Sequence, residues 1–268
     1  MDERLMRRAL DVNFRNLALG HEVFDADGAT FVRDRNFPAI YDANFVFDVK
    51  ASAPDEIDRL LGRVRSEYNY AARWTFRVDP FSPPEFEARL ALDGYKHTEA
   101  LVLILEGSLR GQPKRLDIRL VDDEPTWTGY TNLKILDWQE HAASFGGNVE
   151  DLGVPHGLAR CSRLKYPQVQ YVLAYINGQA VGHCNAWEGR KGIGQVEDLF
   201  VHPSHRHRGV ATALLHFCVA AARARGAGPV TIVANVENTS KAMYATLGWR
   251  PLTVCREYWV DVDPRTEN

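Results

Sequence analysis

Hydrophobic and polar positions in the second half of the chain change repeatedly between the period of a strand and that of a helix. The clearest helix runs from Gly209 to about Arg225, and its apolar side chains recur at helical spacing: Ala211, Leu214, Leu215, Cys218 and Ala222. The expected elements are a strand at 116–121, helical or irregular segments at 126–144 and 155–165, strands at 169–176, 180–187 and 195–201, the helix, a strand at 230–234, a short helix at 240–247 and a final strand pair at 249–260. Asn177-Gly178 predicts a hairpin turn between the second and third of these strands. This order predicts an α/β (α+β) fold, with a mixed central sheet flanked by helices.

The first half shows a similar order of patterns. Helices are expected at 3–20, 54–68 and 84–92, a hairpin at 22–33 that turns at Asp27-Gly28, and strands at 44–49, 74–78 and 95–105. Leu90-Ala-Leu-Asp-Gly-Tyr95 aligns with Tyr244-Ala-Thr-Leu-Gly-Trp249, and the strands upstream of both lie at nearly the same distance. We interpret this as an internal repeat, while an unrelated α/β domain with a coincidental element order is the alternative.

A turn-rich polar segment separates the two halves. Residues 106–114 contain Gly107, Gly111 and Pro113, and they lie between an apolar run and a new alternating stretch. We therefore expect a boundary near residue 110, with one domain at 1–110 and the other at 115–268.

Composition excludes several classes of protein. The formal net charge is −3 and the pI is about 6.3, so no global basic field favours nucleic acid or an anionic membrane as a partner. The N-terminus is too interrupted by charge for a signal peptide and no apolar run approaches 18 residues, which predicts a cytoplasmic protein. The four cysteines are far apart in the sequence and contain no CxxC pair, which indicates reduced thiols.

The segment with the strongest chemical signal joins a strand to a helix. An apolar strand ends at Val201, Pro203 follows, and a short polar loop leads to Gly209, where the helix begins. A glycine lets a ligand approach the backbone, and free N–H groups at the positive end of a helix form an anion site. Arg206 and Arg208 add cationic donors that suit phosphate oxygens.

These residues resemble the GNAT superfamily of N-acetyltransferases. Arg206-His-Arg-Gly-Val-Ala211 is similar to the family signature Arg/Gln-x-x-Gly-x-Gly/Ala. A second block, from Asn238 through Ala242 and Tyr244 to Gly248-Trp249, resembles the later Asn…Ala-x-x-Tyr-x-x-x-Gly-Phe segment, with Trp in place of Phe. The resemblance covers roughly residues 115–260 and implies an acyl-CoA N-acyltransferase-like fold. With the internal repeat, it suggests two such domains in tandem.

The resemblance also implies a reaction, in which acetyl moves from the co-substrate acetyl-CoA to a primary amine by direct attack. Glu197 would be the general base, with Asp198 on the opposite face of the strand, and Tyr244 would donate to the leaving thiolate. The N–H near Leu199 would stabilise the oxyanion. The residues expected to bind the cofactor are Leu199, Phe200, Val201, Arg206, His207, Arg208, Gly209, Val210, Ala211, Thr212 and Asn238.

Other interpretations of the same residues are weaker. His202, His205 and His207 form a cluster, but the cofactor loop explains these positions, so we expect no metal. Cys184 is expected to be a core residue rather than a nucleophile. A non-catalytic acyl-CoA-binding or sensing module would keep the loop without needing Glu197 or Tyr244. A nucleic-acid or protein partner at the Arg-His loop is disfavoured by the net charge.

The partners and the N-terminal half complete the expectations. The acceptor is expected to be a small-molecule or peptide amine. The protein is expected to be either a monomer whose two halves form a pseudo-dimer or a homodimer. In the first half, the loop from Lys50 to Asp55 has neither arginine nor glycine, and Leu90 aligns with Tyr244. That half is therefore expected to be degenerate and to have no cofactor site.

Overall fold

A computed structural model describes residues 2–144, 150–237 and 240–262 of the chain. The chain forms two compact units, each assembled from separate stretches of sequence. Unit 1 contains Met1–Val12, Leu103–Ile232 and Ala242–Arg250, and unit 2 contains Asn13–Val102, Val233–Lys241 and Pro251–Asn268. Each compact unit thus contains residues from both sides of the boundary expected near residue 110. The division into domains at 1–110 and 115–268 stays a prediction about the internal repeat.

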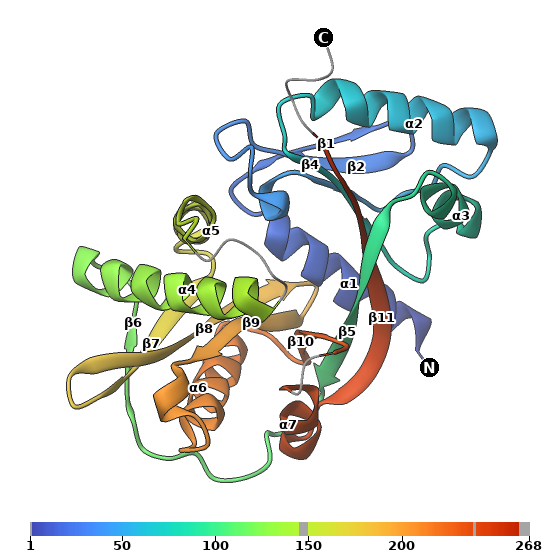
Figure 1. Cartoon of the computed structure of the whole chain (residues 1–268). Coiled ribbons are helices and arrows are strands. Elements are labelled where there is room, and N and C mark those ends of the chain that lie inside the picture. Colours follow the sequence, from blue (N-terminus) through green and yellow to red (C-terminus); the bar gives the residue numbers. More distant parts are fainter. Residues whose placement is uncertain (1, 145–149, 238–239, 263–268) are drawn as a thin grey trace. The chain divides into compact units, whose positions relative to one another are not determined.

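Unit 1 holds the segment with the chemical signal. Its elements are β6 (Asp117–Leu120), α4 (Glu124–Ser144), α5 (Gly153–Lys165), β7 (Gln170–Ile176), β8 (Gln179–Arg190), β9 (Ile193–Val201), the 3-10 turn η2 (Pro203–His205), α6 (Val210–Ala224), the first part of β10 (Val230–Asn235) and most of α7 (Ser240–Leu247). The strand order is β6-β7-β8-β9-β10. Strands β6 to β9 pair antiparallel, and β9 pairs parallel with β10. Helices α4 and α6 lie on opposite faces of these strands (Figure 1).

Unit 2 repeats part of this arrangement. Its elements are the later part of α1 (Glu3–Ala18), β1 (Glu22–Ala26), β2 (Ala29–Arg33), η1 (Tyr41–Ala43), β3 (Phe45–Phe47), α2 (Pro54–Glu67), β4 (Arg73–Val78), α3 (Pro84–Leu92), most of β5 (Lys96–Leu105) and β11 (Arg250–Asp261). The strand order is β1-β2-β3-β4-β11-β5. Strands β3 and β4 pair parallel around α2, as β9 and β10 do around α6, while β11 pairs antiparallel with β4.

The expected mixed α/β fold is confirmed, and the hairpin turns have the expected geometry. Asp27 and Gly28 have φ of 46° and 77°, and Asn177 and Gly178 have φ of 50° and 78°, as a two-residue turn with two left-handed positions requires. The expectation of a final strand pair was wrong, because β11 is one continuous strand of 12 residues.

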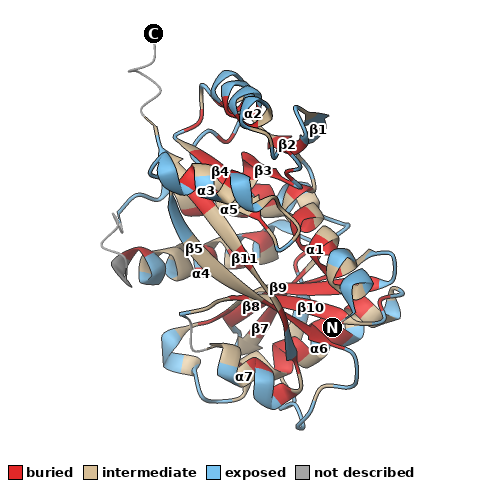
Figure 2. Cartoon of the chain, turned by 90° about the vertical axis from the view of Figure 1, so that its right-hand side faces the viewer, coloured by how far each residue is buried: buried red, intermediate tan, exposed pale blue. Residues whose placement is uncertain are grey.

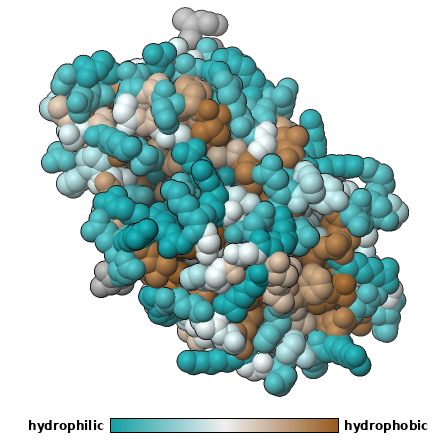
Figure 3. All heavy atoms as spheres, turned by 180° about the vertical axis from the view of Figure 1, so that it is seen from behind, coloured by the Kyte–Doolittle hydropathy of each residue, from teal (hydrophilic) through white to brown (hydrophobic). Residues whose placement is uncertain are grey.

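Burial follows the hydrophobic pattern. In unit 2, Ile57, Leu60, Leu61 and Val64 point from α2 into a core with β2 and β4, while polar residues of α2 stay exposed (Figure 2). All four cysteines are buried free thiols. Hydrophilic side chains cover most of the molecular face in Figure 3. Among the helices of the described ranges, none is both long and apolar enough to span a membrane.

Candidate active site

The strand ladder between β9 and β10 is short. It pairs Gly194 with Val230 and Gln195 with Thr231, and no further pair of β9 with β10 is present among the described residues. From Val196 onward, β9 therefore has no ladder pairing with β10 among the described residues. An edge without such pairing can receive an extended ligand that carries amide groups, as in strand addition.

The other edge of β9 carries a β-bulge. Against β8, Glu197 pairs with Asn185 and Phe200 pairs with His183, so Asp198 and Leu199 together oppose the single residue between these two positions. Asp198 has a φ of 60°, which is left-handed for a residue with a side chain. A bulge re-aims side chains and interrupts the ladder, and bulges are frequent beside active sites.

The bulge changes the expected directions of the two carboxylates. Glu197 is in register with Asn185, which lies two residues from His183 and hence on the same face of β8. Asp198 also contacts His183, so both carboxylates lie on the face covered by α4. The expectation that Asp198 lies on the opposite face from Glu197 was wrong, because strict alternation fails at a bulge.

Asp198 is held by an ion pair inside the protein. Its carboxylate accepts hydrogen bonds from the Lys134 ammonium at 2.7 Å and from the Tyr130 hydroxyl at 2.6 Å, both on α4. Nδ1 of His183 lies 3.6 Å away, and the Asp198 side chain is 23% exposed. Burial would raise the pKa of the Asp198 carboxyl, but the Lys134 ammonium and the hydrogen bond from Tyr130 outweigh burial, so this pKa is well below its ordinary value. Asp198 is therefore an anchored anion that cannot take up a proton at neutral pH.

The same cluster contains the donors of a possible metal site. Asp137, His183 and Asp198 each offer a ligand atom within 4.8 Å of the others. The Lys134 ammonium already lies 2.7 Å from Asp198 and 3.4 Å from Asp137, so a metal ion would have to displace a buried cation. Burial lowers the pKa of His183, which keeps its ring neutral. The arrangement fits a structural ion pair better than a metal centre.

Glu197 has a different environment from its neighbour. Its side chain is half-buried, and it accepts a hydrogen bond from the buried Gln195 amide at 3.1 Å. The neighbouring Cys184 thiol donates to the Glu197 backbone carbonyl over 3.4 Å, and burial raises the pKa of this thiol well above its usual range. A thiol held protonated is no nucleophile.

The turn between β9 and α6 has the backbone geometry of an anion site. His207 and Gly209 both have positive φ, 58° and 84°, and Gly209 is the N-cap of α6. The first turn of α6 closes with the Ala213 N–H bonded to the Gly209 carbonyl. The N–H groups of Val210, Ala211 and Thr212 precede this bond, where a helix has no internal acceptors for them. Together with the helix dipole, such N–H groups can bind an anion.

Arg206 is already engaged in this structure. Its Nε donates to the Val201 carbonyl at 3.0 Å, and its two terminal nitrogens bind the Glu140 carboxylate at 2.7 and 2.5 Å. The guanidinium thereby connects the turn to α4. This contact was not foreseen from the sequence, in which Arg206 was expected to bind the cofactor.

The remaining expected residues are distributed along the same elements. Leu199, Phe200 and Val201 lie on β9, and Arg208 lies in the turn. Tyr244, on α7, is 5% exposed, and its ring centroid lies 5.8 Å from that of Trp249. Asn238 lies outside the described residues. The roles assigned to Glu197, Tyr244 and the cofactor-binding residues stay predictions.

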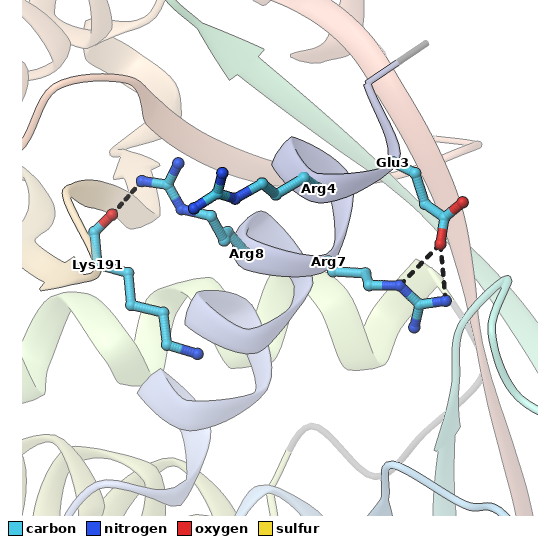
Figure 4. Close-up of a pocket in the computed structure, with 5 residues that line it drawn as sticks. All are labelled: Glu3, Arg4, Arg7, Arg8 and Lys191. Atoms are coloured by element: carbon cyan, nitrogen blue, oxygen red, sulfur yellow. Dashed lines mark hydrogen bonds and ion pairs between the residues drawn. The ribbon is translucent and has the colours of Figure 1, made fainter.

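A separate cationic cavity lies away from this turn. It has a volume of about 740 Å³ and is lined by Arg4, Arg7 and Arg8 of α1, together with Glu3 and Lys191 (Figure 4). Arg7 pairs with Glu3, and Arg8 donates to the Lys191 carbonyl. Its single carboxylate is paired with arginine, so this cavity is a poor candidate for acid–base chemistry.

Comparison with known proteins agrees with the geometry. Residues 131–249 match the acetyltransferase (GNAT) family. A GCN5-related N-acetyltransferase from Kribbella flavida is 14% identical with a TM-score of 0.69, and the match covers 96% of this chain and 95% of that chain. A functionally unknown conserved protein from Staphylococcus epidermidis is 12% identical with a TM-score of 0.68, over 93% of this chain and 98% of that one.

A tandem GNAT protein from the clavulanic acid biosynthesis pathway also has a similar structure. It is 12% identical with a TM-score of 0.58, and the match covers 87% of this chain and 78% of that chain. No curated protein matches the sequence. Residues 131–249 thus match the GNAT acetyltransferase family, and structures with the GNAT fold, a tandem form among them, match most of the length of the chain.

Proposed function

We propose that the protein transfers the acetyl group of acetyl-CoA to a primary amine on a small molecule or peptide. One observation supports this proposal: beyond its short ladder with β10, β9 runs past Glu197 and leads into the turn at Gly209. A ligand with an amide-containing arm and a pyrophosphate matches the edge and the turn together. Acetyl-CoA supplies an activated thioester when it is bound.

The residues of the chain have separate tasks in this proposal. The turn N–H groups hold the phosphates, and the bulge presents Glu197 on the face covered by α4. Glu197 accepts a proton from the amine, directly or through water, because an ammonium with a pKa of about 10.4 cannot attack. Tyr244 donates a proton or a hydrogen bond to the departing thiolate, and the N–H near Leu199 stabilises the oxyanion.

The first experiment tests cofactor binding. In calorimetry with CoA, we expect Gly209→Asp to abolish binding, because its carboxylate repels the phosphates and its Cβ is strained at a φ of 84°. Gly62→Asp is the matched control, since Gly62 is exposed on α2 with no atom near its Cβ position. Unchanged CoA affinity in Gly209→Asp would refute the assignment of the turn.

The second experiment tests the reaction. Release of the CoA thiol is followed with acetyl-CoA and a panel of small amines, amino acids and peptides. Acceptor-dependent release supports the enzyme. Tight CoA binding with no release across the panel would instead favour a non-catalytic acyl-CoA-binding or sensing module. We further expect a cytoplasmic protein that acts as a monomer or a homodimer.

A further inference from the structure

The segment between the two halves of the sequence forms hydrogen bonds with α6 and α7, all within unit 1. Arg223 of α6 donates to the Gly107 carbonyl at 2.7 Å, and the Arg110 N–H donates to the Leu247 carbonyl at 2.9 Å. Nε2 of His216, also on α6, lies 3.3 Å from the Arg110 carbonyl. Residues 106–115, which we call the linker, therefore follow a defined path along these helices.

This path places Lys114 at the anion-binding turn. A Cβ built on Gly209 would lie 3.2 Å from Cδ and 3.3 Å from Cγ of Lys114, so the lysine stem passes directly beside the glycine. The preceding residue, Pro113, restricts the backbone. The Lys114 side chain is exposed, and within the described part of the chain its ammonium has no ion pair or hydrogen bond.

The linker thus brings an unpaired cation to the turn, where one of the two expected arginines, Arg206, already binds another side chain. Arg206 is bound by Glu140 through two hydrogen bonds. A flexible lysine beside a row of backbone N–H groups is a common way to add charge to a phosphate site, and the ammonium can rotate about its stem. The resemblance to the acetyltransferase family did not point to Lys114, which lies outside the segment that matches the family.

We propose that Lys114 is a phosphate-binding residue of the acyl-CoA site, so that the linker forms part of the cofactor site. This inference rests on the proposed function. The ligand class is a CoA thioester, and Lys114 contacts its pyrophosphate.

The test is calorimetry of the full chain with CoA at several salt concentrations. We expect Lys114→Ala to raise the Kd of CoA about fivefold, which corresponds to a surface ion pair near the upper end of the usual range. The dependence of log K on log salt becomes less steep, since one cation leaves the site. Lys114→Arg retains affinity within about twofold, because it keeps the charge.

Arg115→Ala provides the matched control, because it removes a neighbouring exposed linker cation, whereas the atoms nearest to the Gly209 Cβ position all belong to Lys114. We expect its CoA affinity to equal that of the wild type. An unchanged Kd in Lys114→Ala, or an equal loss in Arg115→Ala, would overturn the inference while the proposed function stands. If the wild type itself does not bind CoA, the proposed function fails together with the inference.

Discussion

Glu197 and Asp198 are adjacent residues of the same charge, yet the fold gives them different environments. The bulge lets α4 bind Asp198 through Tyr130 and Lys134, while Glu197 keeps a half-exposed position. Removing one partner of a buried ion pair leaves the other charge uncompensated, which usually costs more than the pair itself contributes. Asp198 should therefore matter for stability, and Glu197 for turnover.

We predict that Asp198→Asn lowers the free energy of unfolding by about 3 kcal/mol near neutral pH. The lowered pKa of Asp198 means that its contribution is fully present above the ordinary carboxyl pKa of about 3.9 and is lost as the pH falls towards the lowered value. Urea denaturation at a series of pH values measures this difference, which should shrink below about pH 4.

Asp137→Asn is the control for this prediction. Its carboxylate lies 3.4 Å from the Lys134 ammonium and is 31% exposed, so its loss should cost about 1 kcal/mol or less. Equal destabilisation by the two variants would show that the buried ion pair of Lys134 with Asp198 contributes no more to stability than its more exposed pair with Asp137.

We predict that Glu197→Gln and Tyr244→Phe each lower turnover at least tenfold, about 1.4 kcal/mol of barrier, while the Kd of acetyl-CoA changes little. The loss in Glu197→Gln should be largest below the pKa of the acceptor amine, where deprotonation limits the rate. Steady-state rates over a range of pH provide the measurement. If neither variant loses tenfold, both catalytic assignments are wrong.

At the scale of elements, α4 is attached to β9 and to the turn that follows it. Lys134 and Tyr130 bind the bulge, and Glu140 binds Arg206. These contacts lie along one helix, so a change in α4 would be felt by the carboxylates and by the phosphate turn. The attachment to the turn is the more exposed one, since the Arg206 and Glu140 side chains are 39% and 46% exposed.

A double-mutant cycle on Arg206→Ala and Glu140→Ala tests this attachment. We predict a coupling free energy of about 0.5–1 kcal/mol in stability, because the pair is bidentate but half-exposed. Calorimetry with CoA on the same variants then separates two roles of the arginine. If Arg206 binds phosphate, Arg206→Ala should weaken CoA binding, whereas Glu140→Ala should not. Zero coupling would show that the contact contributes nothing measurable.

The sequence predicted those elements whose determinants are local. The helix α6 follows from its apolar spacing, and the hairpins follow from Asp27-Gly28 and Asn177-Gly178. The left-handed turn at Gly209 was predictable because a glycine at a strand-to-helix junction is a local signal, and its role in phosphate binding stays a prediction. The bulge at Asp198 was not, since strict alternation gives no sign of an inserted residue. The partners Tyr130, Lys134 and Glu140 come from a distant helix, and only tertiary packing brings them to the site.

At the scale of the whole molecule, the arrangement of β3, α2 and β4 repeats that of β9, α6 and β10, but the start of α2 differs from the start of α6. The Ser52 and Ala53 N–H groups at the start of α2 donate to the Glu56 carboxylate, at 3.1 and 3.2 Å. An anion from the chain itself already occupies these donors. The position aligned with Tyr244 is Leu90, which is fully buried in the core of unit 2.

We therefore predict one acetyl-CoA site per chain. Calorimetric titration should give a stoichiometry of one, and Gly209→Asp should remove all binding, because the Ser52 and Ala53 N–H groups at the start of α2 already bind the Glu56 carboxylate. Two equivalent sites per chain, or binding that survives Gly209→Asp, would contradict this prediction.

The pairing of β11 with β4 also affects how the protein is made on the ribosome. Strand β4 ends at Val78, but its antiparallel partner ends only at Asp261, close to the end of the chain. At a synthesis rate of about 5–20 residues per second, roughly 10–40 s pass between the two. During that time the nascent chain carries an open strand edge, which is a template for aggregation. Unit 2 can complete its sheet only after residues 131–249 have been translated.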